Sequence, residues 1–252
     1  MNALFLLVVL AAGEALDPAV VSAPDAVIDK GTYRVYQRGR PLGTEVFSFE
    51  SSGDSLRVFS TVAQVLPGPN GDSLVIDKQA VLIVGKLDYD LKWYQSTLKA
   101  GGKELTRGLV VQDTAFTSYR ESSTGVGEGV RFHRPPGRLF VVDSQVFVLF
   151  DVMCRNLGTT SFKSRPVSVI LLRDEDDQVT EINATDHGSE TIQWAARPVV
   201  ARKLSFGDNY STFNAWVHPR GYMVRLEQEG SGLRVERDPS PAVKRRDGSS
   251  PR

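Results

Sequence analysis

The hydrophobic pattern of this 252-residue chain changes character once, near its middle. Most of the sequence alternates apolar and polar residues with the period of a β-strand, as where Tyr33 and Val35 share one face of Thr32–Arg38. In contrast, Asp143 to Leu157 (DSQVFVLFDVMCRNL) is apolar around most of a helical circumference. We expect a helix there, with Asp143 or Ser144 capping its first turn and a left-handed Gly158 after its end. A central strand is the alternative, but the run is long for one.

Strand-like runs separated by turns rich in Gly and Pro fill the rest of the sequence. Before the helix, the candidates are residues 32–38, 44–50, 56–66, 74–84, 91–98, 105–112, 116–120 and 129–133. After it, they are residues 167–173, 179–185, 191–195, 199–206, 211–218, 222–228 and 233–237. From these 15 short candidate runs we predict one main helix and about 12 to 14 strands.

A helix that is apolar on almost every face cannot lie on a protein surface, so other elements must surround it. The strands are the available partners. We therefore expect an all-β, mainly antiparallel fold, a curved half-barrel sheet wrapped around one apolar helix. No helix alternates with the strands, which disfavours a parallel βαβ fold. No shift in composition marks a boundary, so residues 30–237 are predicted to form a single domain.

The two ends of the chain differ from this domain. Residues 1–15 resemble a signal peptide, with the apolar run Ala3–Ala12 and small residues at Gly13 and Ala15. A buried N-terminal strand is the alternative. Residues 16–29 are expected to be an irregular leader, and residues 238–252 a disordered basic tail. The protein is thus expected to be exported, periplasmic or extracellular, and soluble after signal cleavage.

Charge and motifs exclude several functions. The formal net charge is zero and basic residues cluster only at Lys244–Arg246, so no nucleic-acid partner is expected. The three histidines lie far apart in the sequence, and neither a metal site nor a cofactor is expected. Residues 174–177 (DEDD) are interpreted as a solvated hairpin tip, and Cys154 as a small buried hydrophobe. No serine elbow or nucleotide-binding loop is present, so we expect no enzyme.

The remaining candidates for function are bulky apolar side chains predicted on the concave face of the sheet or on the helix. They either fill the core or line a cavity for an apolar ligand. The predicted ligand-binding residues are Phe47, Phe49, Trp93, Phe147, Phe150, Met153 and Trp216.

Two hairpins resemble a known group of proteins. YRVYQRGRPLGTEVFSFE at residues 33–50 is similar to the start of a group of secreted bacterial proteins of unknown function, and WVHPRGYMVRLE at residues 216–227 to its last hairpin. The resemblance implies a spiral or half-barrel sheet similar to periplasmic lipoprotein-carrier and glycolipid-binding proteins, with an apolar cleft and a helix as plug or lid. Gly39, Gly43, Trp216 and Gly221 match as structural positions, and no catalytic residue carries over.

Three functional hypotheses follow. The first is an exported, non-catalytic protein that binds a lipid-like or other apolar ligand between the curved sheet and the helix. The second is a cell-envelope scaffold or assembly factor that contacts a protein partner through an exposed sheet edge. The third is a hydrolase whose site includes Asp143, His133 or His187.

Overall fold

The structure is a computed structural model that describes residues 26–67, 73–125, 127–158, 160–173, 176–207 and 211–239. The predicted signal peptide (1–15) and nearly all of the predicted tail lie outside these residues, as does the leader up to residue 25. The strands before the helix are β1 (Ala26–Gln37), β2 (Arg40–Ser52), β3 (Ser55–Pro67), β4 (Ser73–Gly85), β5 (Leu91–Ala100), β6 (Lys103–Val111), β7 (Ala115–Ser122), β8 (Gly127–His133) and β9 (Leu139–Asp143). The helix is α1 (Val148–Leu157), and the strands after it are β10 (Ser164–Leu172), β11 (Gln178–Trp194), β12 (Arg197–Gly207), β13 (Thr212–Val217), β14 (Met223–Gln228) and β15 (Leu233–Arg237).

All strands belong to one 15-stranded sheet with the order β8-β7-β6-β5-β4-β3-β2-β1-β15-β14-β13-β12-β11-β10-β9. Each pair of neighbours is antiparallel except β9 and β10, which run parallel. The first and last strands, β1 and β15, pair at the middle of the sheet, with Val35 opposite Val235. The two free edges of the sheet are therefore β8 and β9.

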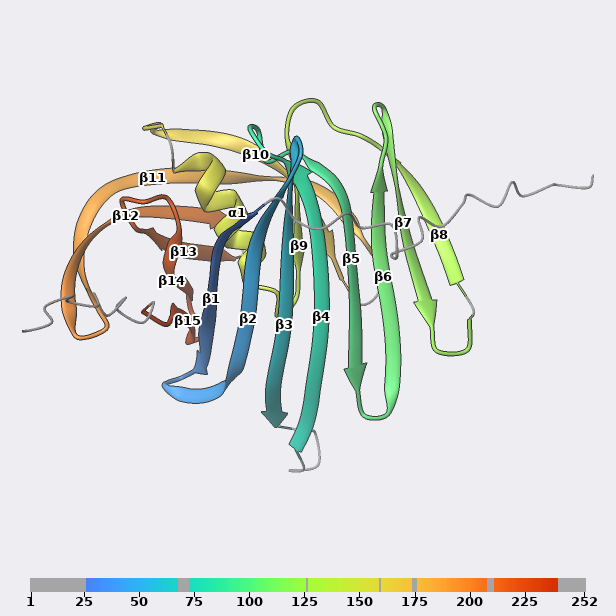
Figure 1. The fold of residues 1–252 in the computed structure, drawn as a ribbon, viewed down its shortest axis with the longest axis horizontal. Helices are drawn as coiled ribbons and strands as arrows, with labels where there is room; N and C mark the ends of the chain where they lie inside the picture. The colour runs from blue at the N-terminus through green and yellow to red at the C-terminus, as the bar shows by residue number, and fades with distance from the viewer. Residues whose placement is uncertain are drawn as a thin grey trace, which may run out of the picture.

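The sheet curves so that β1–β8 form one wall and β10–β15 another, with α1 between them (Figure 1). The expected all-β fold, a curved and mainly antiparallel sheet around one helix, is confirmed. The described residues contain 15 strands, slightly more than the 12 to 14 predicted. The additional feature is a single β9-α1-β10 unit, which is parallel because the chain crosses over through the helix.

The helix is shorter than predicted at its start. Asp143 is the last residue of β9, and Gln145, with a φ of 69°, turns the chain before α1 begins at Val148. Neither Asp143 nor Ser144 therefore caps the helix. Gly158 is not left-handed either, because its φ of −72° continues the right-handed conformation. The apolar run was continuous across a strand, a turn and a helix, so hydrophobicity alone did not separate them.

Two strand boundaries also differ from prediction. β1 begins at Ala26 rather than after an irregular leader ending at residue 29, because Ala26 and Val27 pair with β2. The predicted strands 179–185 and 191–195 are one strand, β11. Its pairing with β12 shifts register between Asp186 and Ser189, around Gly188 with a φ of 82°. A β-bulge keeps a strand continuous where the sequence resembles a turn.

The main core lies between α1 and the inner face of the sheet. Alternate residues of β1–β5 point inward, including Tyr33, Val35, Phe49 and Val58, and they meet buried residues from almost every position of α1. A separate, smaller cluster contains Ile192, Ala201, Trp216 and Val224. One domain thus has a principal core organised around its helix.

Candidate functional site

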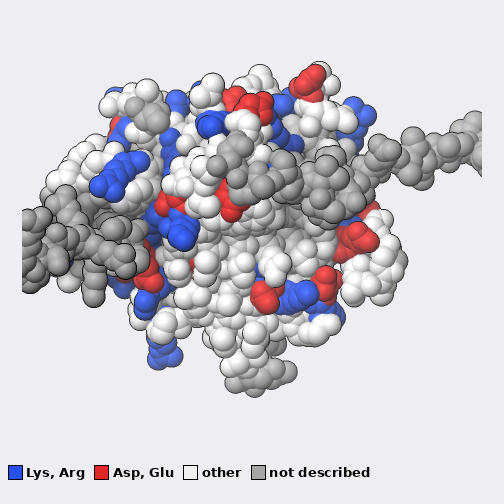
Figure 2. All heavy atoms as spheres, viewed as in Figure 1, with Lys and Arg blue, Asp and Glu red and all other residues white. Residues whose placement is uncertain are grey.

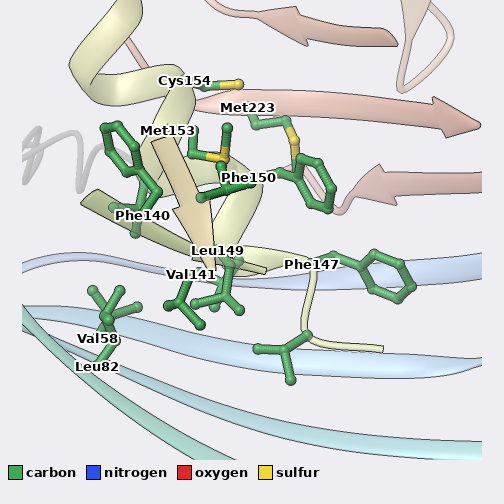
Figure 3. Packing of buried hydrophobic residues seen from close by; sticks show 14 of the residues in the cluster. Val58, Leu82, Phe140, Val141, Phe147, Leu149, Phe150, Met153, Cys154 and Met223 are labelled. Carbon is green, nitrogen blue, oxygen red and sulfur yellow. The ribbon is translucent and has the colours of Figure 1, made fainter. Parts of the chain in front are cut away.

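Five of the seven predicted ligand residues meet in the main core. Phe47 and Phe49 from β2 and Phe147, Phe150 and Met153 from the helical segment are all buried in the same cluster. Figure 3 shows Phe147, Phe150 and Met153 close to one another in this packed interior. The described residues lining the gap between α1 and β4, β5 and β9 enclose only about 10 Å³. That is no more than the room required by one water molecule, so this gap beside α1 is packed rather than hollow.

The other two predicted residues lie elsewhere. Trp93 is half-buried on the outer face, because the inward positions of β5 are taken by its neighbour Tyr94 and by Ser96. Trp216 belongs to the smaller cluster, where its indole N–H donates to Glu190 and Lys203 lies 5.3 Å from its ring. Alternation shows which residues share a face but not which face is concave, so the sequence could not place these two.

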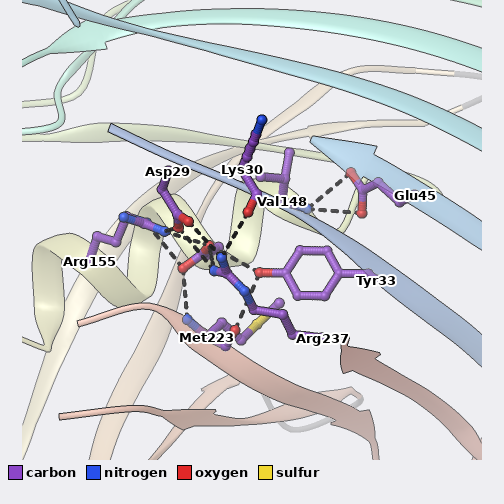
Figure 4. Close-up of polar contacts among 9 residues, drawn as sticks. Asp29, Lys30, Tyr33, Glu45, Val148, Arg155, Met223 and Arg237 are labelled. Carbon is purple, nitrogen blue, oxygen red and sulfur yellow. Dashed lines mark hydrogen bonds and ion pairs between the residues drawn. The ribbon is translucent and has the colours of Figure 1, made fainter. Parts of the chain in front are cut away.

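A buried glutamate holds the start of α1. Glu45 lies on the inner face of β2, is fully buried, and accepts a hydrogen bond from the backbone N–H of Phe147 at 2.9 Å. It also accepts one from the backbone N–H of Val148 at 3.2 Å (Figure 4). The hydroxyl of Ser60 donates to the same carboxyl at 2.6 Å. Burial raises the pKa of Glu45 to about 7, and these hydrogen bonds only partly oppose that effect. A strand residue therefore does the capping that the sequence assigned to Asp143 or Ser144.

A second polar cluster anchors the middle of α1. The carboxylate of Asp151, fully buried, accepts hydrogen bonds from Tyr33 Oη at 3.0 Å, the backbone N–H of Met223 at 2.8 Å and Arg155 Nε at 3.2 Å. Arg155 and Arg237 both bind Asp29 at the start of β1, as Figure 4 shows. This cluster ties the helix to β1, β14 and β15.

The charges in this cluster perturb one another. Burial would raise the pKa of Asp29, but the hydrogen bonds and charge of Arg237, followed by those of Arg155, bring that pKa below its ordinary value. Burial, reinforced by the charge of Asp151, raises the pKa of Tyr33 well above its ordinary value. Asp29 thus stays ionised and pairs with both arginines at physiological pH, while Tyr33 stays neutral and donates its hydroxyl hydrogen to Asp151.

The free edge of β9 is joined to the opposite wall by a third polar cluster. Asp143, buried, accepts hydrogen bonds from Lys78 Nζ at 2.6 Å, Tyr94 Oη at 2.7 Å and Ser96 Oγ at 2.8 Å. Lys78 also donates to the carbonyl of Ser144 at 2.9 Å. Side chains of β4 and β5 therefore hold the half-barrel against β9 without a strand ladder.

The acidic run 174–177 is not simply a solvated tip. Asp174 and Glu175 lie outside the described residues, but the side chain of Asp177 is only 6% exposed. It pairs with Arg120 at 2.9 Å and accepts a hydrogen bond from Ser118, both on β7. The prediction failed for Asp177 because its partners are distant in the sequence.

The outer face of β1–β3 carries an open groove of about 780 Å³. Side chains from Val46, Phe59 and Thr61 contribute to its wall, and Asp238 and Pro239 border it beyond β15. Val46 is 54% exposed although it is aliphatic. In Figure 2, which faces this wall, a broad uncharged area covers β2–β4 and charged side chains gather around it.

The groove continues into a line of apolar side chains across the outer face, which we call the outer apolar stripe. Strand pairing brings Phe59 opposite Val81, Ile83 opposite Trp93, and Trp93 opposite Val110. Val110 is 40% exposed and the others are half-buried. The stripe consists of Val46, Phe59, Val81, Ile83, Trp93 and Val110. Exposed apolar surface that is continuous across several strands is typical of an interaction site.

The described residues offer little other chemistry. They contain no group of three or more His, Cys, Asp or Glu side chains able to hold a metal ion. Cys154 is buried, as predicted, and burial raises the pKa of its thiol well above the ordinary value. None of the helices in the described part of the chain has the length and apolar character to cross a membrane.

A single curved sheet with a polar-anchored helix inside it defines a β-barrel-like domain. No protein-family model matches the chain, and no curated protein matches it. Two solved chains do match in structure. One is described as a beta-barrel-like protein of domain of unknown function DUF1849 from Brucella abortus, with 10% sequence identity and a TM-score of 0.53. The match covers 84% of this chain and 97% of the other.

At this identity the match establishes a shared fold and no shared function. The structural match supports one part of the resemblance seen in the sequence, namely a β-barrel-like domain of unknown function. It does not extend to the lipoprotein-carrier proteins that the resemblance also implied.

Proposed function

We propose that this chain is an exported, non-catalytic binding protein that takes a lipid-like or other apolar ligand on the outer face of its half-barrel. The observation that carries this proposal is the groove of about 780 Å³ at one end of the outer apolar stripe. Its volume is within the range of ligand pockets, and its wall includes exposed Val46 and half-buried Phe59.

The outer groove is a different ligand site from the one expected from the sequence, which lay between the sheet and α1. The gap of about 10 Å³ beside α1 has no room for a ligand. Glu45, Asp151 and Asp143 also hold the helical segment by buried polar contacts, so opening the interior would break all of them. The interior supports the sheet, and the outer face remains available for binding.

The proposal is tested with N-phenyl-1-naphthylamine, an uncharged apolar fluorophore, titrated into the wild type and the variants Val46→Asp and Phe59→Asp. Both side chains face outward, so the variants are expected to keep the wild-type far-ultraviolet circular dichroism spectrum. We expect the dissociation constant to rise at least about tenfold, because a carboxylate in an apolar groove opposes transfer of the probe from water.

The matched control is Val130→Asp on β8, since Val130 is 55% exposed and Val46 is 54% exposed. It should bind the probe like the wild type. The proposal is wrong if the wild type binds no probe, or if all three variants bind it equally well.

A second candidate function is a cell-envelope scaffold that acts through a protein partner, and the β8 edge favours it. β8 pairs only with β7, and nearly all of its residues are exposed. An open edge can accept a strand from another chain, and a lysine on the edge opposes such pairing. If a partner binds there, Val130→Lys should lose it while Val200→Lys, on β12 and equally exposed, should keep it. Equal retention of a purified partner by both variants would rule out this edge.

A further inference from the structure

Three arginines gather around the C-terminal end of α1. Arg202 on β12 donates to the carbonyl oxygens of Gly158 at 2.8 Å and Thr160 at 2.7 Å, and it pairs with Asp186 at 2.6 Å. Arg138, just before β9, donates to the side-chain oxygen of Asn156 at 3.2 Å. Both guanidinium groups therefore bind acceptors at or beside the end of the helix.

Arg165 on β10 differs from these two arginines. Its Nε and Nη2 atoms are buried and have no hydrogen-bond partner within the described part of the chain. Its guanidinium stacks on the ring of Phe162, with 4.6 Å between the guanidinium carbon and the ring centroid. Burial, followed by the positive charges of Arg138 and Arg202, lowers the pKa of Arg165 below its ordinary value. The fold thus places an unpaired cation beside two others.

Without a bound partner, this unpaired cation lowers the stability of the folded protein. A buried donor without a partner loses its hydrogen bonds to water and gains nothing in return, and native proteins contain few of them. Within the described residues, the carboxylate that contacts this group of arginines is that of Asp186, and Arg202 binds it. Arg165 therefore lacks the acceptor that would make its position favourable.

The two unpaired nitrogens also indicate what the acceptor is. Nε and Nη2 form the side of the guanidinium that donates two parallel hydrogen bonds to two oxygens of one carboxylate or phosphate group. The contact with Phe162 holds the plane of this group in one orientation. The positive charges of Arg138 and Arg202 act on Arg165 as well, and the combined positive potential favours an anion over a neutral acceptor.

We propose that Arg165, flanked by Arg138 and Arg202, forms a binding site for a single phosphate or carboxylate group at the C-terminal end of α1. The site is separate from the outer groove and does not depend on the proposed apolar ligand. Because Nε and Nη2 are shielded from water, binding requires a local shift of neighbouring side chains. Arg138 is exposed and is therefore placed to make the first contact with the anion.

The test is isothermal titration calorimetry of the full chain with inorganic phosphate, at constant ionic strength in chloride. We expect one saturable site whose affinity weakens as salt is added. Arg165→Met should weaken binding at least tenfold and Arg138→Met severalfold, whereas Arg131→Met on the exposed strand β8 should bind like the wild type. Absence of phosphate binding by the wild type, or equal binding by Arg165→Met, would overturn the proposal.

A second readout separates a binding residue from a structural one. In phosphate-free buffer, Arg165→Met should melt at the same temperature as the wild type or higher, because the variant removes unpaired donors and charge repulsion. Phosphate should raise the melting temperature of the wild type only. If Arg165→Met instead melts well below the wild type, Arg165 has a structural role that contradicts this assignment.

The source of the anion is resolved by flotation with vesicles. Binding to phosphatidylglycerol vesicles that is lost in Arg165→Met would identify a lipid headgroup. Phosphate binding without vesicle binding would identify a free anion. Either result supports the site.

Discussion

Two carboxylates, Glu45 and Asp151, fix α1 inside the sheet. They differ in their neighbours, because arginines surround Asp151 and neutral donors surround Glu45. Asp151 has Arg155 beside it at 3.1 Å and Arg237 at 4.0 Å. In the described part of the chain, the donors that contact Glu45 are all neutral: the hydroxyl of Ser60 and two backbone N–H groups. A buried charge with cations nearby stays ionised at low cost, whereas a buried charge without them favours its neutral form.

The first prediction concerns Glu45 and pH. Its pKa is about 7 in the folded protein and near 4.5 in the unfolded chain, so the folded state binds the proton more tightly. Its contribution to stability is therefore complete below about pH 4.5 and is lost as the pH rises through about 7. At roughly 1.4 kcal/mol per pKa unit, the difference between the two ends of this range is on the order of 3 kcal/mol.

This contribution is measured by urea unfolding of the wild type and Glu45→Gln at several pH values between 5 and 8. The glutamine cannot ionise, so the stability difference between the two proteins should change with pH in favour of Glu45→Gln as the pH rises. A difference that is constant over this range would show that Glu45 does not titrate in the folded protein.

The second prediction concerns Asp151. Among the described residues, Asp151→Ala leaves Asp29 as the counter-ion of Arg155 and Arg237, and breaking a buried ion pair in this way costs about 3–5 kcal/mol. Tyr33→Phe removes only one neutral donor to the same carboxylate and should cost about 1 kcal/mol. Urea unfolding of both variants gives the comparison. Equal losses would mean that the charge of Asp151 is not what holds this cluster together.

The sequence predicted which side chains share a face of a strand, but not which distant residues they contact. The alternation that put Phe47 and Phe49 on one face of β2 also put Glu45 there, so an inward carboxylate was predictable. Its partners were not, because Phe147 and Val148 lie more than 100 residues away. The same holds for Asp143, whose place at the end of β9 opposite Lys78 depends on how the sheet curves.

At the scale of elements, α1 determines the architecture. It is buried on nearly all sides, as its composition indicated, and its only charged residues within the helix, Asp151 and Arg155, are paired with each other. The boundary at Val148 was not predictable, because the apolar run extends through β9 and the turn. The parallel pairing of β9 with β10 is the consequence of placing one helix between two neighbouring strands.

The third prediction tests whether α1 is part of a packed core. Phe150 lies with its ring centroid 4.7 Å from that of Phe213 and 6.2 Å from that of Phe206. Phe150→Ala should lower the free energy of unfolding by about 3–5 kcal/mol, because a tightly packed site cannot collapse around the cavity. Val130→Ala, at an exposed position, should change it by less than about 0.5 kcal/mol. A loss below 1 kcal/mol for Phe150→Ala would indicate a hollow interior with a loosely held helix.

At the scale of the whole molecule, the all-β half-barrel was predictable because alternation and turn residues define strands locally, and an apolar helix requires covering. The outer groove was not predictable. It depends on the register that brings Val46 and Phe59 to neighbouring outward positions and on the chain continuing past Arg237 to Pro239. For the same reason, Trp93 was identified as a ligand residue from its type, but its place on the outer apolar stripe required the structure.

The central claim is that the outer face carries an apolar ligand. The most direct measurement is native mass spectrometry of the protein purified from the cells that produce it, followed by solvent extraction, for the wild type, Phe59→Asp and Val130→Asp. We predict an extra mass that extracts as lipid from the wild type and Val130→Asp and is lost from Phe59→Asp. A wild type that carries no extra mass, or an extra mass that Phe59→Asp retains in full, would contradict the claim.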